Sequence, residues 1–360
     1  MHFAPTREQR LFSGTLDALL GAGVPGAAAR AWSRGDRGPG GRLWNGLAEA
    51  GLFALAVPDE HGGVGLRPVE LALGMVEAGR HAVPGPLVET AAAAVLLDGG
   101  VDGGTESGAD GGRSAARIAD GDLAVSLAVP PWAPHALDAD WAGAVLVLEG
   151  GSVQAAEPVE PLESLDPARK PWRVRAAAPL PGAPGDPPLA FDLALLCCAA
   201  QALGVGERLL EATVGHVKAR HQFGQAVGGF QAVRHRLADT ATALRFARPL
   251  VLGAAAAFAA EAPEGGEPPP TAALRARDVS AAKAAACDAA HTAARAALQM
   301  HGAIGYTDEF PLSLWIRKAH ALRRAWGSPA AHRARVLWAL DRLGPHHRGA
   351  PVRTTGAAAR

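Results

Sequence analysis

The stretch RHQFGQAVGGFQAVRHRLAD, residues 220–239, places an arginine, a phenylalanine and a glutamine at fixed offsets around glycine-containing turns just before a helical pattern. A second stretch, LQMHGAIGYTDEFPLSLWIRKAH (298–320), ends a helix at Gln299 and then passes through Gly302. A glycine turn lets the backbone approach a ligand closely, and free N–H groups at a helix start bind anions. When each stretch is taken singly, helix capping by glycine and arginine is the commoner explanation.

Both stretches lie in a region that is helical from residue 190 to residue 343. Apolar residues recur there at helical spacing in five segments, at 190–218, 229–260, 271–301, 310–325 and 329–343. Long, alanine-lined helices with mostly short connections predict an antiparallel four-helix bundle. We assign residues 189–344 to this bundle and 345–360 to a tail.

The part of the chain before the bundle has two different patterns. Leucine and phenylalanine recur at helical spacing through the first hundred residues, which predicts an N-terminal helical domain over 1–112 that closes in a glycine-rich linker at 99–112. Short apolar runs bounded by proline, glycine and aspartate then predict strands. They indicate a small β domain over 113–188 that is thin for an independent core. The strand segments are 122–129, 142–150 and 171–178.

Composition excludes several classes of function. The chain has 360 residues, of which 49% are apolar, so most of it is expected to fold into a sizeable core. Its 35 basic and 35 acidic residues give a net charge of zero, so no overall positive potential is expected that would attract nucleic acid or an anionic membrane. The longest apolar stretch, from Leu193, is interrupted at Gln201 and is too short to cross a bilayer, and the N-terminus lacks a signal sequence. We expect a cytoplasmic protein.

Histidine and cysteine give no sign of a metal centre. The thirteen histidines show no ligand spacing, since His216 and His221 are five residues apart, the wrong interval for one helix face. Three cysteines, of which Cys197 and Cys198 are adjacent, are typical of a reducing compartment. The sequence therefore predicts no metal site.

Taken together, the two opening stretches resemble motifs of the acyl-CoA dehydrogenase family. The family's R-x-x-F-G…Q segment and its Q-x-x-G-G-x-G-[YF] segment read here as Arg220, Phe223, Gly224 and Gln231, then Gln299, Gly302, Ala303, Gly305 and Tyr306. RKAH from Arg317 resembles the family's RDAK, and VPDEHGG (57–63) resembles PEEYGG. The resemblance covers nearly the whole chain. It implies a mainly α fold with an N-terminal helical domain, a small middle β domain and a C-terminal four-helix bundle.

The resemblance also implies the chemistry. Family members use FAD to dehydrogenate an acyl-CoA thioester between its α and β carbons, and they pass electrons to an acceptor flavoprotein. In this family the arginine, phenylalanine and glutamine reach across a dimer interface to the flavin held by the neighbouring subunit. By resemblance, the cofactor-binding residues of this chain are Arg220, Phe223, Gln231, Gln299, Gly302 and Ala303.

The family's catalytic base has no counterpart in the sequence. A carboxylate removes the α-proton in these enzymes, and it usually lies just before a Gly-Thr pair that follows the RDAK helix. At that place this chain has Trp326, ahead of Gly327 and Ser328. Other members place the base on the first helix of the bundle, at the position of Ala194. The catalytic residue is therefore unknown, and the nearby acids that could substitute for it are Asp192, Glu207 and Glu211.

Two further departures point to a partner chain. Leu195 stands where an arginine is usual, and the middle domain lacks the Thr-Glu-Pro and Trp-Ile-Thr stretches that hold the isoalloxazine ring. The chain thus resembles the base-less subunit of heteromeric actinobacterial steroid side-chain enzymes, which completes the FAD site of a catalytic chain in a heterotetramer. Two alternatives stay open: a self-sufficient homo-oligomer with a displaced base, and a non-enzymatic interaction protein that retains the fold.

Overall fold

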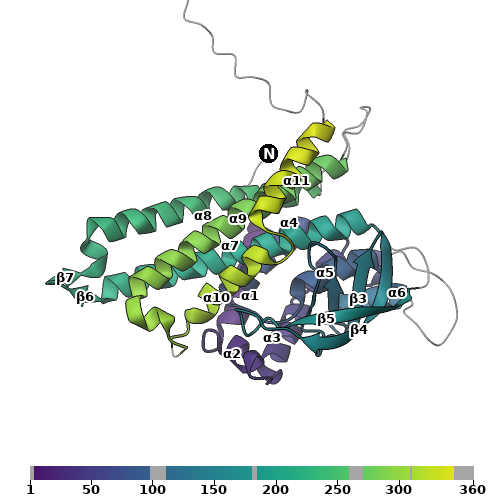
Figure 1. Ribbon diagram of the computed structural model, residues 1–360, viewed down its shortest axis with the longest axis horizontal. Helices are drawn as coiled ribbons and strands as arrows, with labels where there is room; N and C mark the ends of the chain where they lie inside the picture. The colour runs from purple at the N-terminus through teal and green to yellow at the C-terminus, as the bar shows by residue number, and fades with distance from the viewer. Residues whose placement is uncertain (1–3, 98–110, 181–184, 259–270, 309, 344–360) are drawn as a thin grey trace, which may run out of the picture.

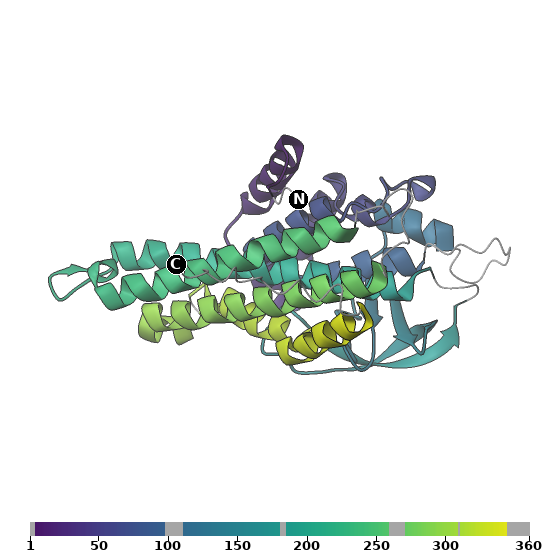
Figure 2. The ribbon, with the colours of Figure 1, turned by 90° about the horizontal axis from the view of Figure 1, so that it is seen from above.

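The structure, a computed structural model, describes residues 4–97, 111–180, 185–258, 271–308 and 310–343. A long helical bundle forms the body, the N-terminal helices pack along one side of it, and a small sheet lies near one end (Figure 1). Figure 2 shows that the bundle extends well beyond the other two parts at the end opposite the sheet. Most of the predicted linker and the whole predicted tail lie outside the described residues.

The N-terminal part consists of five helices and two short 3-10 turns. The first helix begins at a capping box, in which Thr6 Oγ1 accepts from Gln9 N–H and Gln9 Oε1 accepts from Thr6 N–H. The elements are α1 (Arg7–Gly21), α2 (Ala27–Ser33), α3 (Gly38–Glu49), η1 (Phe53–Ala56), η2 (Asp59–His61), α4 (Pro68–Arg80) and α5 (Leu87–Leu96).

The middle part is a five-stranded sheet that follows α6 (Gly111–Ala119), and the expected boundary at residue 112 falls inside this helix. Strand order is β1-β3-β4-β5-β2, parallel between β1 and β3 and antiparallel elsewhere. The three predicted strand segments are confirmed, while β2 and β4 were not predicted. The strands are β1 (Val125–Ala128), β2 (Ala136–Leu137), β3 (Ala144–Glu149), β4 (Ser152–Pro161) and β5 (Pro171–Pro179).

The sheet shares its core with the helices around it. Thr90 of α5 exchanges hydrogen bonds with Val125 of β1, since its hydroxyl accepts from the N–H and donates to the carbonyl. Ser126 Oγ donates to Leu137 O at 2.7 Å, which draws the sheet's two outer strands together. Most buried apolar side chains of the sheet belong to one cluster with those of the N-terminal helices and the bundle. The thin β region is therefore stabilised by its neighbours, as its size predicts.

The C-terminal part confirms the five predicted helical segments, with ends that move by up to three residues. A small hairpin joins the first two helices, and short 3-10 turns precede α8 and follow α9. The elements are α7 (Pro187–Ala219), β6 (His221–Gln222), β7 (Gln225–Ala226), η3 (Val227–Gly229), α8 (Gln231–Phe258), α9 (Thr271–His301), η4 (Gly302–Tyr306), α10 (Ser313–Arg324) and α11 (Pro329–Leu343).

Helix α7 is the centre of the molecule. It begins earlier than predicted because Asp186 caps it, accepting from Leu189 N–H at 2.8 Å, and prolines follow at the first helical positions. Glycines let α4 cross it closely: a Cβ at Gly204 would lie 1.9 Å from Val76 O. By length and composition, helices α7 and α8 could each cross a bilayer. The expectation that the apolar stretch from Leu193 is too short to do so was therefore wrong. Most of the apolar window of α7 is buried within the protein.

Candidate functional site

The first stretch forms an exposed hairpin at the tip of the bundle. Strands β6 and β7 pair His221 with Ala226 and Gln222 with Gln225, which leaves a two-residue turn at Phe223 and Gly224. Both turn residues have positive φ, 52° and 81°, as the tightest hairpin turns require. The Phe223 side chain is 91% exposed. A phenylalanine in this left-handed conformation is uncommon and strained, so the ring is presented to solvent at a conformational cost.

The other predicted residues of this stretch flank the hairpin. Arg220 caps the C-terminus of α7, and its carbonyl accepts from Val227 N–H at 2.8 Å, which closes the base of the hairpin. Gln231 is the first residue of α8. Both side chains are exposed. The hairpin therefore carries a cation, a ring and an amide outward on a short rigid support.

The second stretch ends at the same tip. Gln299 is exposed in the last turn of α9, and Gly302, with φ of 61°, and Ala303 begin an exposed 3-10 turn. A Cβ at Gly302 would meet nothing within 4 Å, so the backbone there is open to an approaching molecule. The rings of His216 on α7 and His301 on α9 lie 4.1 Å apart, which holds the two stretches at one end of the bundle.

This tip fits one half of a dinucleotide site and not a self-contained pocket. All six predicted residues are exposed, and the nearest ring to Phe223 is that of Phe230, at 6.2 Å between centroids. An arginine, an aromatic face, carboxamides and an open glycine turn suit pyrophosphate and a flat ring system. Since all six residues are exposed, they form no enclosed pocket within this subunit.

The position that the sequence resemblance aligns with the family's base holds a buried indole. Trp326 adopts a φ of 58° and is 2% exposed. Its Nε1–H donates to Glu89 Oε1 at 3.2 Å, and its carbonyl lies 2.8 Å from His332 Nε2. Ala194, the alternative base position, is fully buried in α7. Neither residue can take a proton from a substrate.

The three acids considered as substitutes are engaged in ion pairs. Asp192 is buried and bonded by two guanidinium groups, from Arg275 at 2.8 Å and from Arg335 at 2.6 Å. Glu207 accepts two hydrogen bonds from Arg248, both at 3.0 Å. Glu211 is exposed and paired with Arg80 at 2.9 Å. All three carboxylates are thus engaged by guanidinium groups, and none is free to contact a substrate as a base.

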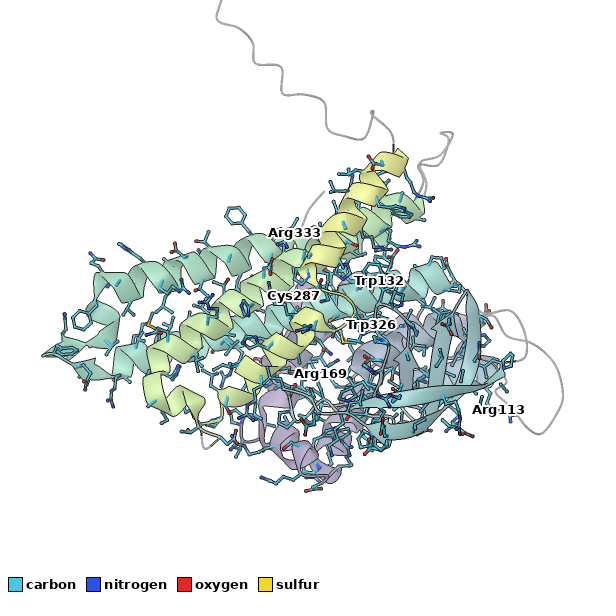
Figure 3. All side chains as sticks on the ribbon, viewed as in Figure 1. Arg113, Trp132, Arg169, Cys287, Trp326 and Arg333 are labelled. Atoms are coloured by element: carbon cyan, nitrogen blue, oxygen red, sulfur yellow. The ribbon has the colours of Figure 1, made fainter. Side chains whose placement is uncertain are left out.

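Sequence reasoning missed a fourth acid, Glu89. It is only 3% exposed in α5, and its Oε2 has no hydrogen-bond partner. Burial raises the pKa of the Glu89 carboxyl, against the opposing charge of Arg169. Glu89 lines a cavity of about 580 Å³ between the middle part and the bundle, together with Trp132, Arg169 and Trp326. Figure 3 places these last three residues at that junction. A lone acid in the apolar run LVETAAAAVL was the available signal.

Aromatic side chains fill the space beside this cavity. Trp132 stacks on His332 with ring centroids 5.4 Å apart, and Phe191 lies between Trp132 and Trp326, at 5.4 and 6.2 Å. A Cβ at Gly327 would come within 2.7 Å of the Trp132 ring. Burial, with the nearby Lys283 charge, lowers the pKa of His332 to about 4. Aromatic rings and a histidine thus pack closely along one side of the cavity, around Gly327.

A buried lysine anchors the loop that carries Trp326. Lys283 is fully buried, and its Nζ donates to Leu322 O at 3.0 Å and to Cys287 Sγ at 3.1 Å. Leu322 lies in the last turn of α10, where carbonyls lack partners within the helix and a cation is favourable. Lys283 therefore fixes the end of α10 and, with it, the position of the indole.

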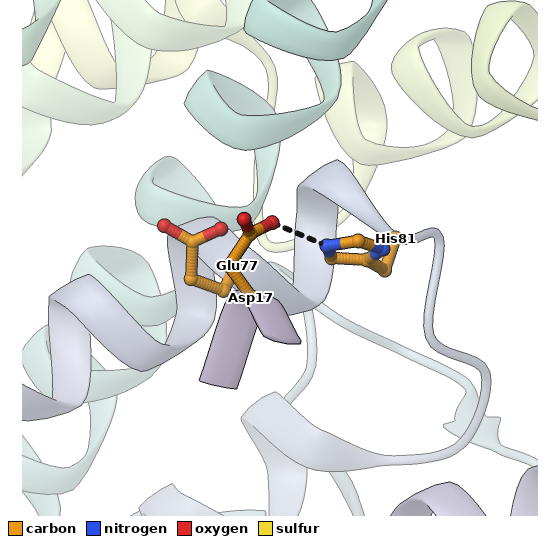
Figure 4. Close-up of side chains that lie close together, drawn as sticks. All are labelled: Asp17, Glu77 and His81. Carbon is orange, nitrogen blue, oxygen red and sulfur yellow. Dashed lines mark hydrogen bonds and ion pairs between the residues drawn. The ribbon is translucent and has the colours of Figure 1, made fainter. Parts of the chain in front are cut away.

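A separate group of acids and one histidine lies on the N-terminal side of the bundle. Ligand atoms of Asp17, Glu77 and His81 lie within 4.8 Å of one another, and His81 Nε2 lies 2.8 Å from Asp17 Oδ1 (Figure 4). Ser13 also donates to Glu77 Oε1 at 2.7 Å, and Arg80 Nε lies 3.4 Å from Glu77 Oε2. Since a guanidinium group already balances the acids, the cluster is an ion-pair network that joins α1 to α4.

Known proteins were compared with the chain as a whole. Residues 6–105 match the acyl-CoA dehydrogenase N-terminal domain, and residues 190–340 match the C-terminal domain. The acyl-CoA dehydrogenase IpdE2 of Mycobacterium tuberculosis is 31% identical over 90% of this chain and 95% of its own length. IpdE2 of Mycolicibacterium smegmatis is 28% identical over 90% and 96%.

Solved structures show the same fold. The ChsE4-ChsE5 complex from Mycobacterium tuberculosis matches with a TM-score of 0.76 and 22% identity, over 94% of this chain and 98% of the matched one. A glutaryl-coenzyme A dehydrogenase bound to glutaryl-CoA gives 0.77 and 20%, over 96% and 97%. With both terminal domains matched and a relative above 30% identity across nearly its whole length, the chain belongs to the acyl-CoA dehydrogenase family of FAD-dependent oxidoreductases.

Proposed function

We propose that this chain is the base-less subunit of a heteromeric acyl-CoA dehydrogenase. Its hairpin and its turn after α9 complete the FAD site of a catalytic partner chain, which supplies the base for α,β-dehydrogenation of an acyl-CoA thioester. The observation that carries the proposal is Phe223, held with positive φ at the tip of the hairpin and 91% exposed. Such strain is typical of functional positions, and no packing within the subunit compensates for it.

Two other features support this division of labour. The base position holds Trp326, whose indole is committed to Glu89, and the junction beside it is filled by aromatic rings. The substrate class follows from relatives: a fold neighbour is described as a steroid acyl-CoA dehydrogenase built from Tcur3481 and Tcur3483, and another as the ChsE4-ChsE5 complex. We infer an acyl-CoA of lipid or steroid catabolism, a cytoplasmic heterotetramer and a flavoprotein as electron acceptor.

Co-expression with a family member that carries the glutamate tests the proposal. The purified pair is expected to be yellow, and the chain alone colourless. Arg220→Ala and Phe223→Ala should each lower the flavin-to-protein absorbance ratio of the pair without separating the two chains on a sizing column. Arg175→Ala, on the exposed strand β5 far from the tip, is the matched control and should leave the ratio unchanged.

Other outcomes assign other functions. If the chain alone is yellow and reduces an electron acceptor with an acyl-CoA, it is a self-sufficient homo-oligomeric enzyme. If a pair forms and the tip variants alter neither its flavin content nor its activity, the chain is an interaction protein that retains the fold. Two chains that do not associate would overturn the heteromeric proposal.

A further inference from the structure

The tip of the bundle carries an excess of positive charge. Residues 212–238, which run through the end of α7, the hairpin and the start of α8, include four Lys or Arg side chains and no acid. Residues 289–307, at the end of α9 and in η4, add one arginine and again no acid. All five cations are exposed: Lys218, Arg220, Arg234, Arg236 and Arg295.

None of these five side chains pairs with a carboxylate in the part of the chain that the structure describes. Arg234 Nε donates to Gly228 O at 3.1 Å, which holds its guanidinium group against the base of the hairpin. Asp239, the first acid of α8, is exposed as well, and with the five cations it gives the tip a net charge of +4. On the sheet, by contrast, Arg173 and Arg175 are both paired with glutamates of β4.

This concentration of charge has no purpose within the subunit. Like charges repel one another, so the five cations contribute nothing favourable to the stability of their own fold. The whole chain has a net charge of zero, and the tip is therefore polarised relative to the rest of the molecule. The pyrophosphate of FAD carries about two negative charges and would match only part of the excess.

We propose that the tip is an electrostatic docking surface that fits an acidic surface of the catalytic partner chain. The inference rests on the proposed function and extends it, because it assigns the chemistry of the partner: Asp and Glu side chains that face Lys218, Arg236 and Arg295. Attraction between the two surfaces raises the rate at which the chains find each other and orients the tip before the ring of Phe223 reaches the flavin.

Stopped-flow mixing of the full chain with the FAD-loaded partner measures the association rate constant at about 25, 100 and 400 mM NaCl. The rate constant is expected to fall at least about tenfold across this range, because salt screens the attraction. Lys218→Gln and Arg236→Gln should each lower it about two- to threefold at the middle salt concentration. The dissociation rate constant should change by less than about twofold, since charges at the rim of an interface act mainly on association.

Arg245→Gln is the matched control. Arg245 is also exposed on α8, but it lies about 13 Å of helix beyond Arg236. That distance exceeds the screening length of about 10 Å at 100 mM salt, so this variant should associate at the wild-type rate.

Charge reversal gives a sharper test. Lys218→Glu, Arg236→Glu and Arg295→Glu together change the net charge of the tip from +4 to −2, so the rate constant should rise with salt instead of falling. The pair formed at saturation should keep its flavin, since Arg220 and Phe223 are unchanged. Repeating the wild-type series with the partner freed of FAD separates carboxylates from phosphates, and the salt dependence should persist.

Three results would overturn the docking surface. A rate constant that is independent of salt, or that falls with salt equally in the reversed variant, would show that these charges steer nothing, while a yellow pair would leave the proposed function intact. Loss of the salt dependence on removal of FAD would mean that the cations meet only the phosphates of the cofactor. Chains that do not associate at all would overturn the proposed function and this extension with it.

Discussion

The indole Nε1–H of Trp326 donates to Glu89 Oε1 at 3.2 Å, and this bond joins the loop after α10 to the helix α5 of the N-terminal part. The position predicted to correspond to the family's carboxylate thus holds a hydrogen-bond donor, and the carboxyl group of Glu89 reaches the same place from another helix. The pair links the N-terminal part to the C-terminal part beside the cavity that the middle part also lines.

Trp326→Phe should show what this bond contributes. The ring stays, but Glu89 loses its donor, and a buried carboxyl with both oxygens unpaired costs about 1–3 kcal/mol of the free energy of unfolding. Urea denaturation of single and double variants measures it, with Glu89→Gln as the second change. The loss of unfolding free energy caused by Trp326→Phe should be smaller when residue 89 is glutamine, because burying an unpaired amide costs less free energy than burying an unpaired carboxylate. Trp338→Phe, at a half-exposed indole on α11, is the control. Equal losses in both backgrounds would contradict a direct bond.

Phe223→Asn should separate stability from function. Asparagine tolerates positive φ and forms with Gly224 the Asn-Gly pair that two-residue hairpin turns prefer. The isolated chain should therefore gain about 0.5–1 kcal/mol in thermal unfolding. The assembled pair should lose flavin, since the ring is gone. A variant that is no more stable would mean that the turn carries no strain, and retained flavin would mean that the ring serves no cofactor.

Gly204→Ala should destabilise the fold by about 3 kcal/mol or more. The added methyl group would lie 1.9 Å from Val76 O, and helices α4 and α7 would have to separate. Gly215→Ala, in the same helix with nothing within 4 Å of the new Cβ, should instead stabilise by about 0.5–1 kcal/mol. Differential scanning calorimetry of the two variants compares them directly, and changes of the same sign would exclude the close helix crossing.

Asp138→Asn should change how stability depends on pH. Asp138 accepts from Trp32 Nε1–H at 2.9 Å, and burial raises its pKa to about 6 from an ordinary value of 3.8. Between about pH 4 and pH 6 the folded chain holds a proton that the unfolded chain has released, so unfolding free energy falls as pH rises. The wild type should lose up to about 3 kcal/mol across this window relative to the variant.

The measurement is the difference in Tm between Asp138→Asn and the wild type at pH 4 and at pH 7.5. The variant should gain at the higher pH, since asparagine does not titrate and tolerates the φ of 51°. Asp140→Asn, at an exposed neighbour, should show no such trend. A constant difference at the two pH values would mean that Asp138 titrates normally.

Periodicity predicted the helices well because most are long and lie on an apolar core. Strand β4 escaped prediction because SVQAAEPVEP is mostly exposed and contains two prolines, and Pro158 adjoins an irregularity in the pairing with β5. The residues of the tip were predicted from a resemblance, yet their exposure was not, because sequence does not say which face a short hairpin presents. Glu89 and Lys283 could not be recognised, since their roles depend on helices far away in the chain.

Phe223 is almost fully exposed and contributes little to the stability of its own subunit. The requirement for a stable fold therefore does not explain an aromatic ring at this position. Replacement of Phe223 by leucine, asparagine or glycine would leave the folding stability of the chain unchanged or would raise it. Under the proposed function, the requirement for an aromatic ring at this position comes from the partner chain, whose flavin it would contact. The proposal therefore predicts that substitutions at residue 223 are constrained by the sequence of the partner chain and not by the stability of this one.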